Sequence, residues 1–101
     1  MTAREFFESL PGRADPERIA GIDSSYLFDV AGEGRWLVEV RDGRVTVTED
    51  PEGQGDVGFA LTAETFERID GRKLNPMVAY MTGKLKVTGD IGAAMALQRI
   101  L

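Results

Sequence analysis

The sequence predicts a single domain of the mixed α/β (α+β) class, and three observations support this. The chain has 101 residues, 43% of them hydrophobic, which suffices for one packed core but not for two. Apolar residues recur with a helical period towards both ends of the chain, whereas residues 26–61 mostly alternate between apolar and polar side chains, as strands do. Asp42-Gly43 separates two alternating runs and is typical of a hairpin turn. We therefore expect residues 1–101 to form one domain.

Two helices are predicted at the start of the chain. In the first, Thr2–Leu10, Thr2 and Glu5 are spaced as in a capping box, and Pro11-Gly12 is expected to end the helix. Asp15-Pro16 opens a second, short helix, because Asp is a good N-cap and Pro suits the first helical position. The residues expected to face the core are Phe6, Phe7 and Leu10, followed by Ile19, Ala20 and Ile22.

Three strands in an antiparallel meander are predicted next. Gly32-Glu33-Gly34 supplies the first turn between them and Asp42-Gly43 the second. The residues that alternate toward the core are Tyr26, Phe28 and Val30, then Trp36, Val38 and Val40, then Val45 and Val47. Core packing is the expected role of Trp36, and a place in the wall of a ligand cavity is the alternative.

A crossover, a fourth strand and a helix follow the meander. Residues 49–55 are acidic and rich in Gly and Pro, and they are long for a hairpin, so they fit a crossover. The strand Asp56–Leu61 leads to Thr62, which is expected to cap the helix Ala63–Asp70. The residues expected to face inward are Val57, Phe59, Leu61, Phe66 and Ile69.

The last quarter of the chain predicts a helix, a strand and a second helix. Asn75-Pro76 starts the first helix and Gly83 ends it, after which Lys84–Thr88 alternates as a half-buried strand does. Gly89 is expected to allow a sharp bend, and Asp90 to cap the helix Ile91–Leu101. A phosphate site at this helix start is not expected, because the glycine spacing and lysine of phosphate-binding loops are missing.

This quarter of the chain resembles the sterol carrier protein type 2 domain family. The residues that carry the resemblance are Asn75-Pro76, Met81, Gly83-Lys84-Leu85-Lys86-Val87, Gly89-Asp90, Ala94-Met95 and Leu97-Gln98. The resemblance implies a five-stranded mixed sheet (the antiparallel three-strand meander, the crossover and two more strands) with helices covering one face. It also implies that the domain holds a lipid in an internal apolar tunnel.

Candidate ligand-binding residues lie on the helices that would cover the sheet. They are Phe66, Met77, Met81, Ile91, Met95, Leu97, Gln98 and Leu101. Methionine is flexible and polarizable, which suits a cavity that closes around lipids of varied shape. Taken alone, these residues are more simply interpreted as an ordinary core, and the resemblance favours a lined cavity. Gln98, which similar family members share, would either hydrogen-bond a ligand or face solvent.

Charged side chains have simpler interpretations than catalysis. Lys84 and Lys86 share one face of their strand, where they could meet anionic headgroups but more simply keep an edge strand soluble. The pairs Glu5/Glu8 and Glu64/Glu67 lie one helical turn apart, and we expect a solvated surface at both.

Composition excludes several classes of function. With no histidine and no cysteine, the 101 residues contain no Ser-His-Asp triad, thiol nucleophile or usual zinc site, so we expect no enzyme and no cofactor or metal. Residues 1–56 carry a net charge of −7 and residues 57–101 a net charge of +2. We expect no nucleic-acid partner for so acidic a chain. The basic half could meet an anionic headgroup or membrane surface, although uneven solvated charge is the simpler interpretation.

The sequence also leads to an expected location. No apolar run reaches the ~18 residues of a membrane span, and Glu5 and Glu8 fall where a signal peptide would be apolar. We expect a cytoplasmic protein with at most transient membrane contact. The lack of a terminal Ser-Lys-Leu address and the preference for arginine over lysine fit a free-standing bacterial protein.

The leading functional hypothesis from the resemblance is non-catalytic lipid binding and transfer. The ligand would be a fatty acid, a fatty acyl-CoA or a similar apolar molecule. The alternative is an accessory module that presents a lipid or isoprenoid quinone intermediate to a partner enzyme. In either case, Ile100-Leu101 would close the tunnel mouth, leave it open for a larger or second ligand, or form an exposed apolar patch that binds a partner or a second copy.

Overall fold

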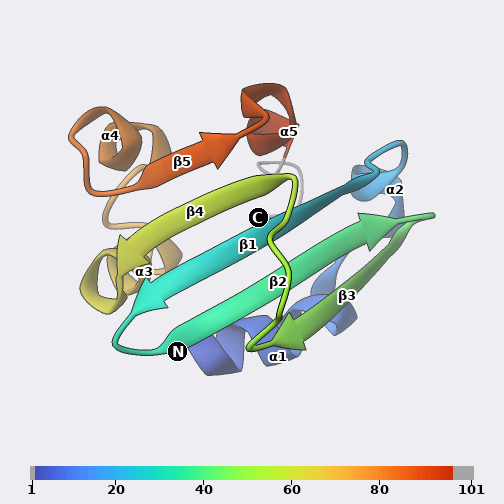
Figure 1. Ribbon diagram of the computed structural model, residues 1–101, viewed down its shortest axis with the longest axis horizontal. Coiled ribbons are helices and arrows are strands. Elements are labelled where there is room, and N and C mark those ends of the chain that lie inside the picture. Colours follow the sequence, from blue (N-terminus) through green and yellow to red (C-terminus); the bar gives the residue numbers. More distant parts are fainter. Residues whose placement is uncertain (1, 97–101) are drawn as a thin grey trace.

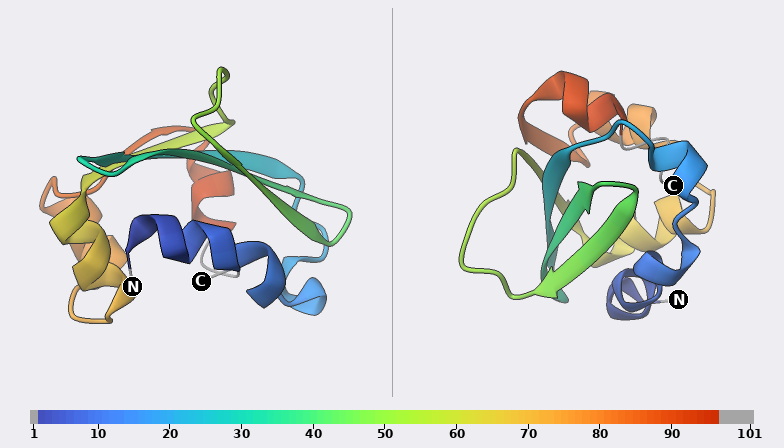
Figure 2. Two further views of the ribbon diagram at one scale, coloured as in Figure 1. Left: turned by 90° about the horizontal axis from the view of Figure 1, so that it is seen from below. Right: turned by 90° about the vertical axis from the view of Figure 1, so that its right-hand side faces the viewer.

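The computed structural model describes residues 2–96 and confirms the predicted mixed architecture (Figure 1). The elements in chain order are α1 (Ala3–Arg13), α2 (Pro16–Ile19), β1 (Ser24–Ala31), β2 (Gly34–Arg41), β3 (Arg44–Glu49), β4 (Val57–Thr62), α3 (Ala63–Asp70), α4 (Pro76–Met81), β5 (Lys86–Gly89) and α5 (Ile91–Ala96). Within these residues, five strands form one sheet in the order β3-β2-β1-β4-β5. The helices lie on one side of the sheet, and the β3–β4 connection passes over the other side (Figure 2). None of the described helices is long and apolar enough to cross a membrane.

The predicted meander is confirmed. β1 pairs antiparallel with β2, and β2 pairs antiparallel with β3. The β2–β3 turn holds Asp42 and Gly43 at φ values of 53° and 72°, between the paired residues Arg41 and Arg44. Positive φ at both positions gives the turn the twist of its strands, which explains why this pair is so strong a hairpin signal.

The predicted crossover is also confirmed, and it makes the sheet mixed. β4 pairs parallel with β1 and antiparallel with β5, so β4 lies between the first strand and the last. Leu27, on the face of β1 opposite the helices, is nevertheless buried. A side chain at Gly55 would come within 2.7 Å of the carbonyl oxygen of Ser25. The crossover therefore lies directly against β1.

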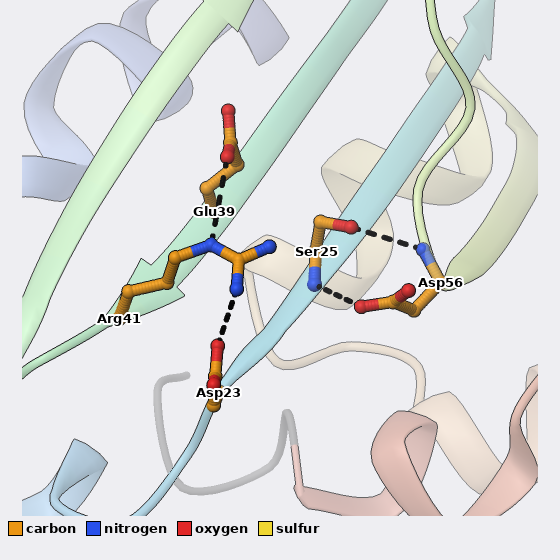
Figure 3. A network of polar contacts seen from close by, with 5 residues as sticks. All are labelled: Asp23, Ser25, Glu39, Arg41 and Asp56. Atoms are coloured by element: carbon orange, nitrogen blue, oxygen red, sulfur yellow. Dashed lines mark hydrogen bonds and ion pairs between the residues drawn. The ribbon is translucent and has the colours of Figure 1, made fainter.

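Two reciprocal hydrogen bonds fix the end of the crossover. The backbone N–H of Ser25 donates to the Asp56 carboxylate, and the backbone N–H of Asp56 donates to the Ser25 hydroxyl, both at 3.0 Å (Figure 3). Beside them, Arg41 forms ion pairs with Asp23 and Glu39 (Figure 3). These ion pairs are exposed and add little stability. The Ser25–Asp56 bonds lie directly before the first paired residues of β1 and β4, Tyr26 and Val57.

The first helix extends further than predicted. Pro11-Gly12 does not end α1, and the helix continues to Arg13 with Pro11 inside its last turn. The backbone N–H of Ala14 donates to the carbonyl of Leu10 at 3.1 Å, and the Arg13 guanidinium lies 4.8 Å from the centre of the Phe6 ring. These contacts hold the turn around the proline. The predicted capping box is confirmed, and the Thr2 backbone N–H and hydroxyl hold the pKa of Glu5 below its usual value.

The predicted helix caps at Asp15 and Thr62 are confirmed, whereas one residue predicted to be buried, Ala20, is not. The side chain of Asp15 accepts from the N–H of Glu17 at 2.9 Å, and that of Thr62 accepts from the N–H of Thr65 at 3.1 Å. Ile19 and Ile22 are buried as predicted. Ala20 is exposed instead, because the helix stops at Ile19 and the chain turns at Ala20.

The last strand begins later than predicted. Lys84 and Leu85 do not belong to β5, since their backbone N–H groups both donate to the carbonyl of Ala79, at 2.8 and 3.0 Å. They complete the C-terminal turn of α4 instead. Lys86 therefore opens β5, which is an edge strand as predicted. The predicted helix Ile91–Leu101 is confirmed as far as Ala96, and its last five residues lie outside the described part of the chain.

Candidate functional site

The inner face of the sheet is filled by aromatic side chains over β1 and β2. Phe7 of α1 is fully buried and stacks on Trp36 of β2, with ring centres 4.9 Å apart and planes 16° apart. Its ring also lies 5.0 Å from Phe28 and 5.7 Å from Phe66. Trp36 is 1% exposed, so its expected place in the core is confirmed. This half of the molecule is an ordinary dry core.

The opposite half, around β5 and α5, is less completely covered. The apolar residues that pack here are only partly buried, although they contact the core: Leu85, Val87, Ala93, Ala94 and Ala96. No residue of α5 within Ile91–Ala96 is fully buried. Alanine offers one methyl group to a neighbouring surface, so three alanines cover the sheet thinly. Within the described chain, α5 therefore packs loosely against the strands β4 and β5.

Within residues 2–96, a single side-chain hydrogen bond joins α5 to the sheet. The hydroxyl of Tyr26 donates to the backbone carbonyl of Ala93 at 2.9 Å. Burial raises the pKa of Tyr26 above its usual value of 10.0, and the carboxylates of Asp56 and Asp90 raise it further. The hydroxyl thus stays protonated and able to donate at neutral pH.

The entry into α5 is confirmed as a sharp bend. Gly89 has φ +89°, and a Cβ placed there would overlap the carbonyl oxygen of Asp56. The same carbonyl accepts from the N–H of Asp90 at 3.2 Å. The side chain of Asp90 in turn accepts from the N–H of Ala93 at 3.2 Å, as expected of an N-cap. Glycine is required at this bend because the two backbones approach so closely.

The predicted ligand residues of α4 lie on its outer side. Ala79 is its buried residue, whereas Met77 and Met81 are 42% and 77% exposed. At 100° per residue, these two methionines form a stripe on the side of the helix opposite Ala79. Val78 and Tyr80 flank the stripe and are 48% and 46% exposed. The structure therefore turns the large apolar side chains of α4 away from the sheet.

The predicted residues of α5 are arranged in the same way. Ile91 and Met95 are 51% and 56% exposed, and at 100° per residue they lie on the side of the helix opposite Ala93. α4 and α5 lie at opposite ends of β5, so the two stripes are separate (Figure 1). Phe66 is buried in the aromatic cluster, 5.3 Å from Phe6.

The described residues thus place the candidate side chains at three separate locations. That they line a ligand cavity stays a prediction. The remaining candidates Leu97, Gln98 and Leu101 lie outside the described residues.

The partial burial of Val87 and Ala94 was not predicted from the sequence. The signal that could have indicated it is the cluster of four small residues Gly92, Ala93, Ala94 and Ala96 directly after an edge strand. Small side chains on a helix that must cover a sheet leave contacts unmade.

Two surface clefts lie away from these residues. One, of about 370 Å³, is polar and is lined by Arg4, Glu33, Gly34, Arg35, Glu49 and Asp50, with an ion pair between Arg4 and Glu49. The other, of about 360 Å³, is lined by side chains that include Asp29, Ala60, Thr62, Lys84 and Lys86. Neither is lined by a candidate ligand residue.

Polar chemistry contributes little to the site. In residues 2–96, each buried side-chain nitrogen or oxygen has a hydrogen-bond partner, and His, Cys, Asp and Glu form no group of three that could hold a metal. The carboxylate pairs Glu5/Glu8 and Glu64/Glu67 are exposed, as expected for a solvated surface. The candidate site therefore consists mainly of apolar side chains.

Comparison with known proteins gives a consistent assignment. Residues 5–101 match the model of the SCP-2 sterol transfer family. Hydroxysteroid dehydrogenase-like protein 2 of Danio rerio is 32% identical over 100 residues, which is 96% of this chain and 24% of that protein. Human sterol carrier protein 2 is 33% identical over 86 residues, which is 83% of this chain and 16% of that protein. The chain thus spans about a quarter, or less, of the length of these curated relatives.

The fold agrees with a solved structure of the same kind. The solution structure of the sterol carrier protein domain 2 of Helicoverpa armigera superposes with a TM-score of 0.77 at 27% identity. The match covers 93% of this chain and 80% of that one. Its extent shows that the sheet, the crossover and the covering helices belong together as one known fold.

Proposed function

The chain belongs to the SCP-2 sterol transfer family, and from this premise we propose that it binds and transfers a lipid without catalysing a reaction. The ligand is a fatty acid, a fatty acyl-CoA or a similar apolar molecule. Histidine and cysteine are both missing from the 101 residues, so acid–base catalysis by imidazole and nucleophilic attack by a thiol have no side chain here to carry them.

The observation that carries the proposal is the thin packing beneath α5. Val87 and Ala94 face the core but are only partly buried, in a domain whose other half is tightly filled. An apolar ligand between α5 and the strands β4 and β5 would complete this half of the core. Burial of its chain would stabilise the complex by about 0.8 kcal/mol per methylene.

The helix α5 is suited to give access to such a ligand. In the described residues it is attached through three partly buried alanines, the Tyr26–Ala93 hydrogen bond and the bond from the Asp90 N–H to the Asp56 carbonyl. Few buried contacts mean a low free energy of local opening. Ile91 and Met95, and the α4 residues Met77 and Met81, are then available to contact the ligand when the helices move around it.

Native mass spectrometry of protein purified without detergent tests the proposal. We expect a retained lipid, or uptake of an added long-chain fatty acid, its CoA ester or an isoprenoid quinone. Ala94→Phe, which puts a large side chain between α5 and the strands, should abolish uptake. Ala60→Phe makes the same change on the exposed opposite face of the sheet and should not. An apo mass with none of the three ligands taken up contradicts the proposal.

A charged side chain gives a second test of the same surface. Met95→Asp should weaken uptake by tenfold or more, about 1.4 kcal/mol. Thr46→Asp, on an exposed position of β3, adds the same charge far from α5 and should leave uptake unchanged. Equal loss in both variants would indicate a general effect of charge and would contradict an apolar site at α5.

An accessory role is the second candidate. The curated relatives are several times longer than this chain, so in them the matched domain adjoins further protein. We propose that, in this alternative, the domain presents its lipid to a partner enzyme or pairs with a second copy. A monomeric native mass that persists as the protein is concentrated would argue against the second copy.

A further inference from the structure

The crossover leaves part of the outer face of the sheet uncovered. We define the outer face as the side of the sheet opposite the helices. Leu27 on this face is buried, and Gly55 of the crossover lies against the backbone of Ser25 and Leu27. Two residues further along β1, Asp29 is exposed. The crossover rises from the outer face (Figure 2), so another molecule can approach the uncovered part only beside it.

One row of residues crosses this uncovered part from strand to strand. Asp29 of β1 pairs with Ala60 of β4, and Ala60 pairs with Lys86 of β5. All three are exposed on the outer face, and neither charged side chain forms an ion pair with another described residue. Arg35, the β2 neighbour of Asp29, lines the other surface cleft. The row thus has an unpaired carboxylate on one side of Ala60 and an unpaired ammonium group on the other.

The surface is hollowed at this row. The cleft of about 360 Å³ described above is lined by Asp29, Ala60 and Lys86, together with Thr62 and Lys84. Neighbouring strands lie about 4.8 Å apart, so the backbones of Asp29 and Lys86 are separated by roughly 10 Å. The short side chain of Ala60 lies between them. The cleft therefore has a negative side on β1 and a positive side at β5.

We propose that this row is the contact between two copies of the chain, related by a two-fold axis that passes over Ala60 parallel to β4. Rotation about this axis exchanges the two sides of the row, so Asp29 of each copy meets Lys86 of the other. Packed sheets lie about 10 Å apart, a gap that an aspartate and a lysine side chain span together. The inference goes beyond the proposed function, because this face has no part in lipid binding there.

Charge complementarity favours a second copy as the occupant. A face with a carboxylate on one side and lysines on the other is complementary to itself under two-fold rotation, which is the symmetry of most protein dimers. The contact involves only the short strands β1, β4 and β5, so we expect a weak and reversible dimer. α5 lies on the helix side of the sheet (Figure 2). Pairing through the outer face would leave it uncovered in both copies.

Reversal of single charges tests the contact. Sedimentation of the full chain should show a monomer–dimer equilibrium as the concentration is raised to about 1 mM, with less dimer as salt is added. Asp29→Lys should raise the dissociation constant at least tenfold, because it places lysine against lysine, and Lys86→Asp should do the same with carboxylates. Both positions are exposed, so neither change is expected to unfold the protein, and circular dichroism checks this.

A mixture of the two variants gives the sharpest test. When one copy carries Asp29→Lys and the other Lys86→Asp, each introduced charge meets its opposite, so the pair should associate although each variant alone does not. Native mass spectrometry distinguishes the mixed dimer by its mass. Glu17→Lys mixed with Arg18→Asp, at exposed positions of α2, makes the same changes of net charge and should form mixed dimers no more often than chance.

Three results would overturn the proposal. The first is unmodified protein that stays monomeric throughout the concentration series, and the second is a mixture of Asp29→Lys and Lys86→Asp that does not pair. The third is a dimer that persists in Asp29→Lys but is lost in Met81→Asp, which would assign the contact to the exposed apolar side chains of α4. None of these measurements involves lipid uptake, so their outcome is independent of the proposed function.

Discussion

The hydroxyl of Tyr26, on the central strand β1, donates a 2.9 Å hydrogen bond to the backbone carbonyl of Ala93 in α5. The two residues are 67 positions apart in the sequence. Tyr26 is fully buried, and its ring lies against Phe59 at 6.3 Å. One side chain thus both fills the core and holds the last described helix.

Removal of this hydroxyl should loosen α5 selectively. Tyr26→Phe keeps the ring and loses the hydrogen bond, which should lower the free energy of unfolding by about 1 kcal/mol. Amide hydrogen exchange should accelerate in residues 91–96 more than in β1 or β2. Tyr80→Phe removes an exposed hydroxyl and should change stability by less than about 0.5 kcal/mol. Uniform acceleration across the sheet would contradict a local role.

The raised pKa of Tyr26 predicts a loss of stability in alkali. The folded state holds the phenolic proton more tightly than the unfolded state, whose pKa is near 10.0. The Tyr26 contribution is fully present below that pH and decreases as the pH rises through the higher pKa of the folded state. Urea unfolding measured at increasing pH should show this decrease. In Tyr26→Phe the decrease should be shallower, and an identical slope would rule out Tyr26 as its source.

Substitution of two glycines should distinguish the cost of backbone strain from the cost of a steric clash with a neighbouring backbone. Gly83 and Gly89 have similar φ values, +81° and +89°, but only at Gly89 does an added Cβ meet other atoms, those of the Asp56–Val57 backbone. Gly83→Ala should cost about 1 kcal/mol of conformational strain. Gly89→Ala should cost clearly more, because β4 and β5 have to separate. Urea denaturation compares the two, and equal costs would mean that the contact is relieved without penalty.

The aromatic core should be the most sensitive part of the fold. Phe7 contacts Trp36, Phe28 and Phe66 at ring distances of 4.9–5.7 Å. Phe7→Ala should therefore lower the free energy of unfolding by about 3–5 kcal/mol. Met81→Ala, at a 77% exposed position, should change it by less than about 0.5 kcal/mol. Chemical denaturation measures both, and a small effect at Phe7 would show that the cluster collapses to fill the space.

Local signals in the sequence were sufficient for most of the elements. The caps at Thr2, Asp15, Thr62 and Asn75 were predicted because each side chain bonds an N–H two or three residues away. The Asp42-Gly43 turn was predicted for the same reason, since its geometry depends on two residues. Strand order was not derivable in this way. The parallel pairing of β1 with β4 joins residues about 30 positions apart, and the family resemblance implied only that the sheet is mixed.

The direction of the α4 side chains was not predictable from the sequence. Residues 76–81 are almost uniformly apolar, so no polar side marks which residue faces solvent. The structure places the smallest of them, Ala79, inward and Met77 and Met81 outward. Two other predictions were wrong for a related reason: that Pro11 ends the first helix and that Ala20 is buried. The Arg13–Phe6 contact supports the helical turn at Pro11, and the end of α2 at Ile19 leaves Ala20 exposed.

The position of β4 in the sheet has a consequence for the order in which a growing chain can fold. The meander β1–β3 is complete once residue 49 is made, but β1 keeps one unpaired edge until residues 57–62 emerge. Such an edge is a template for pairing with another nascent chain. Residues 49–56, which are synthesised directly after the meander, carry four acidic side chains and no cation. These carboxylates would repel the same segment of another copy. In the finished protein the crossover lies against β1 near Leu27, and during synthesis we expect its carboxylates to disfavour pairing of that edge with another copy.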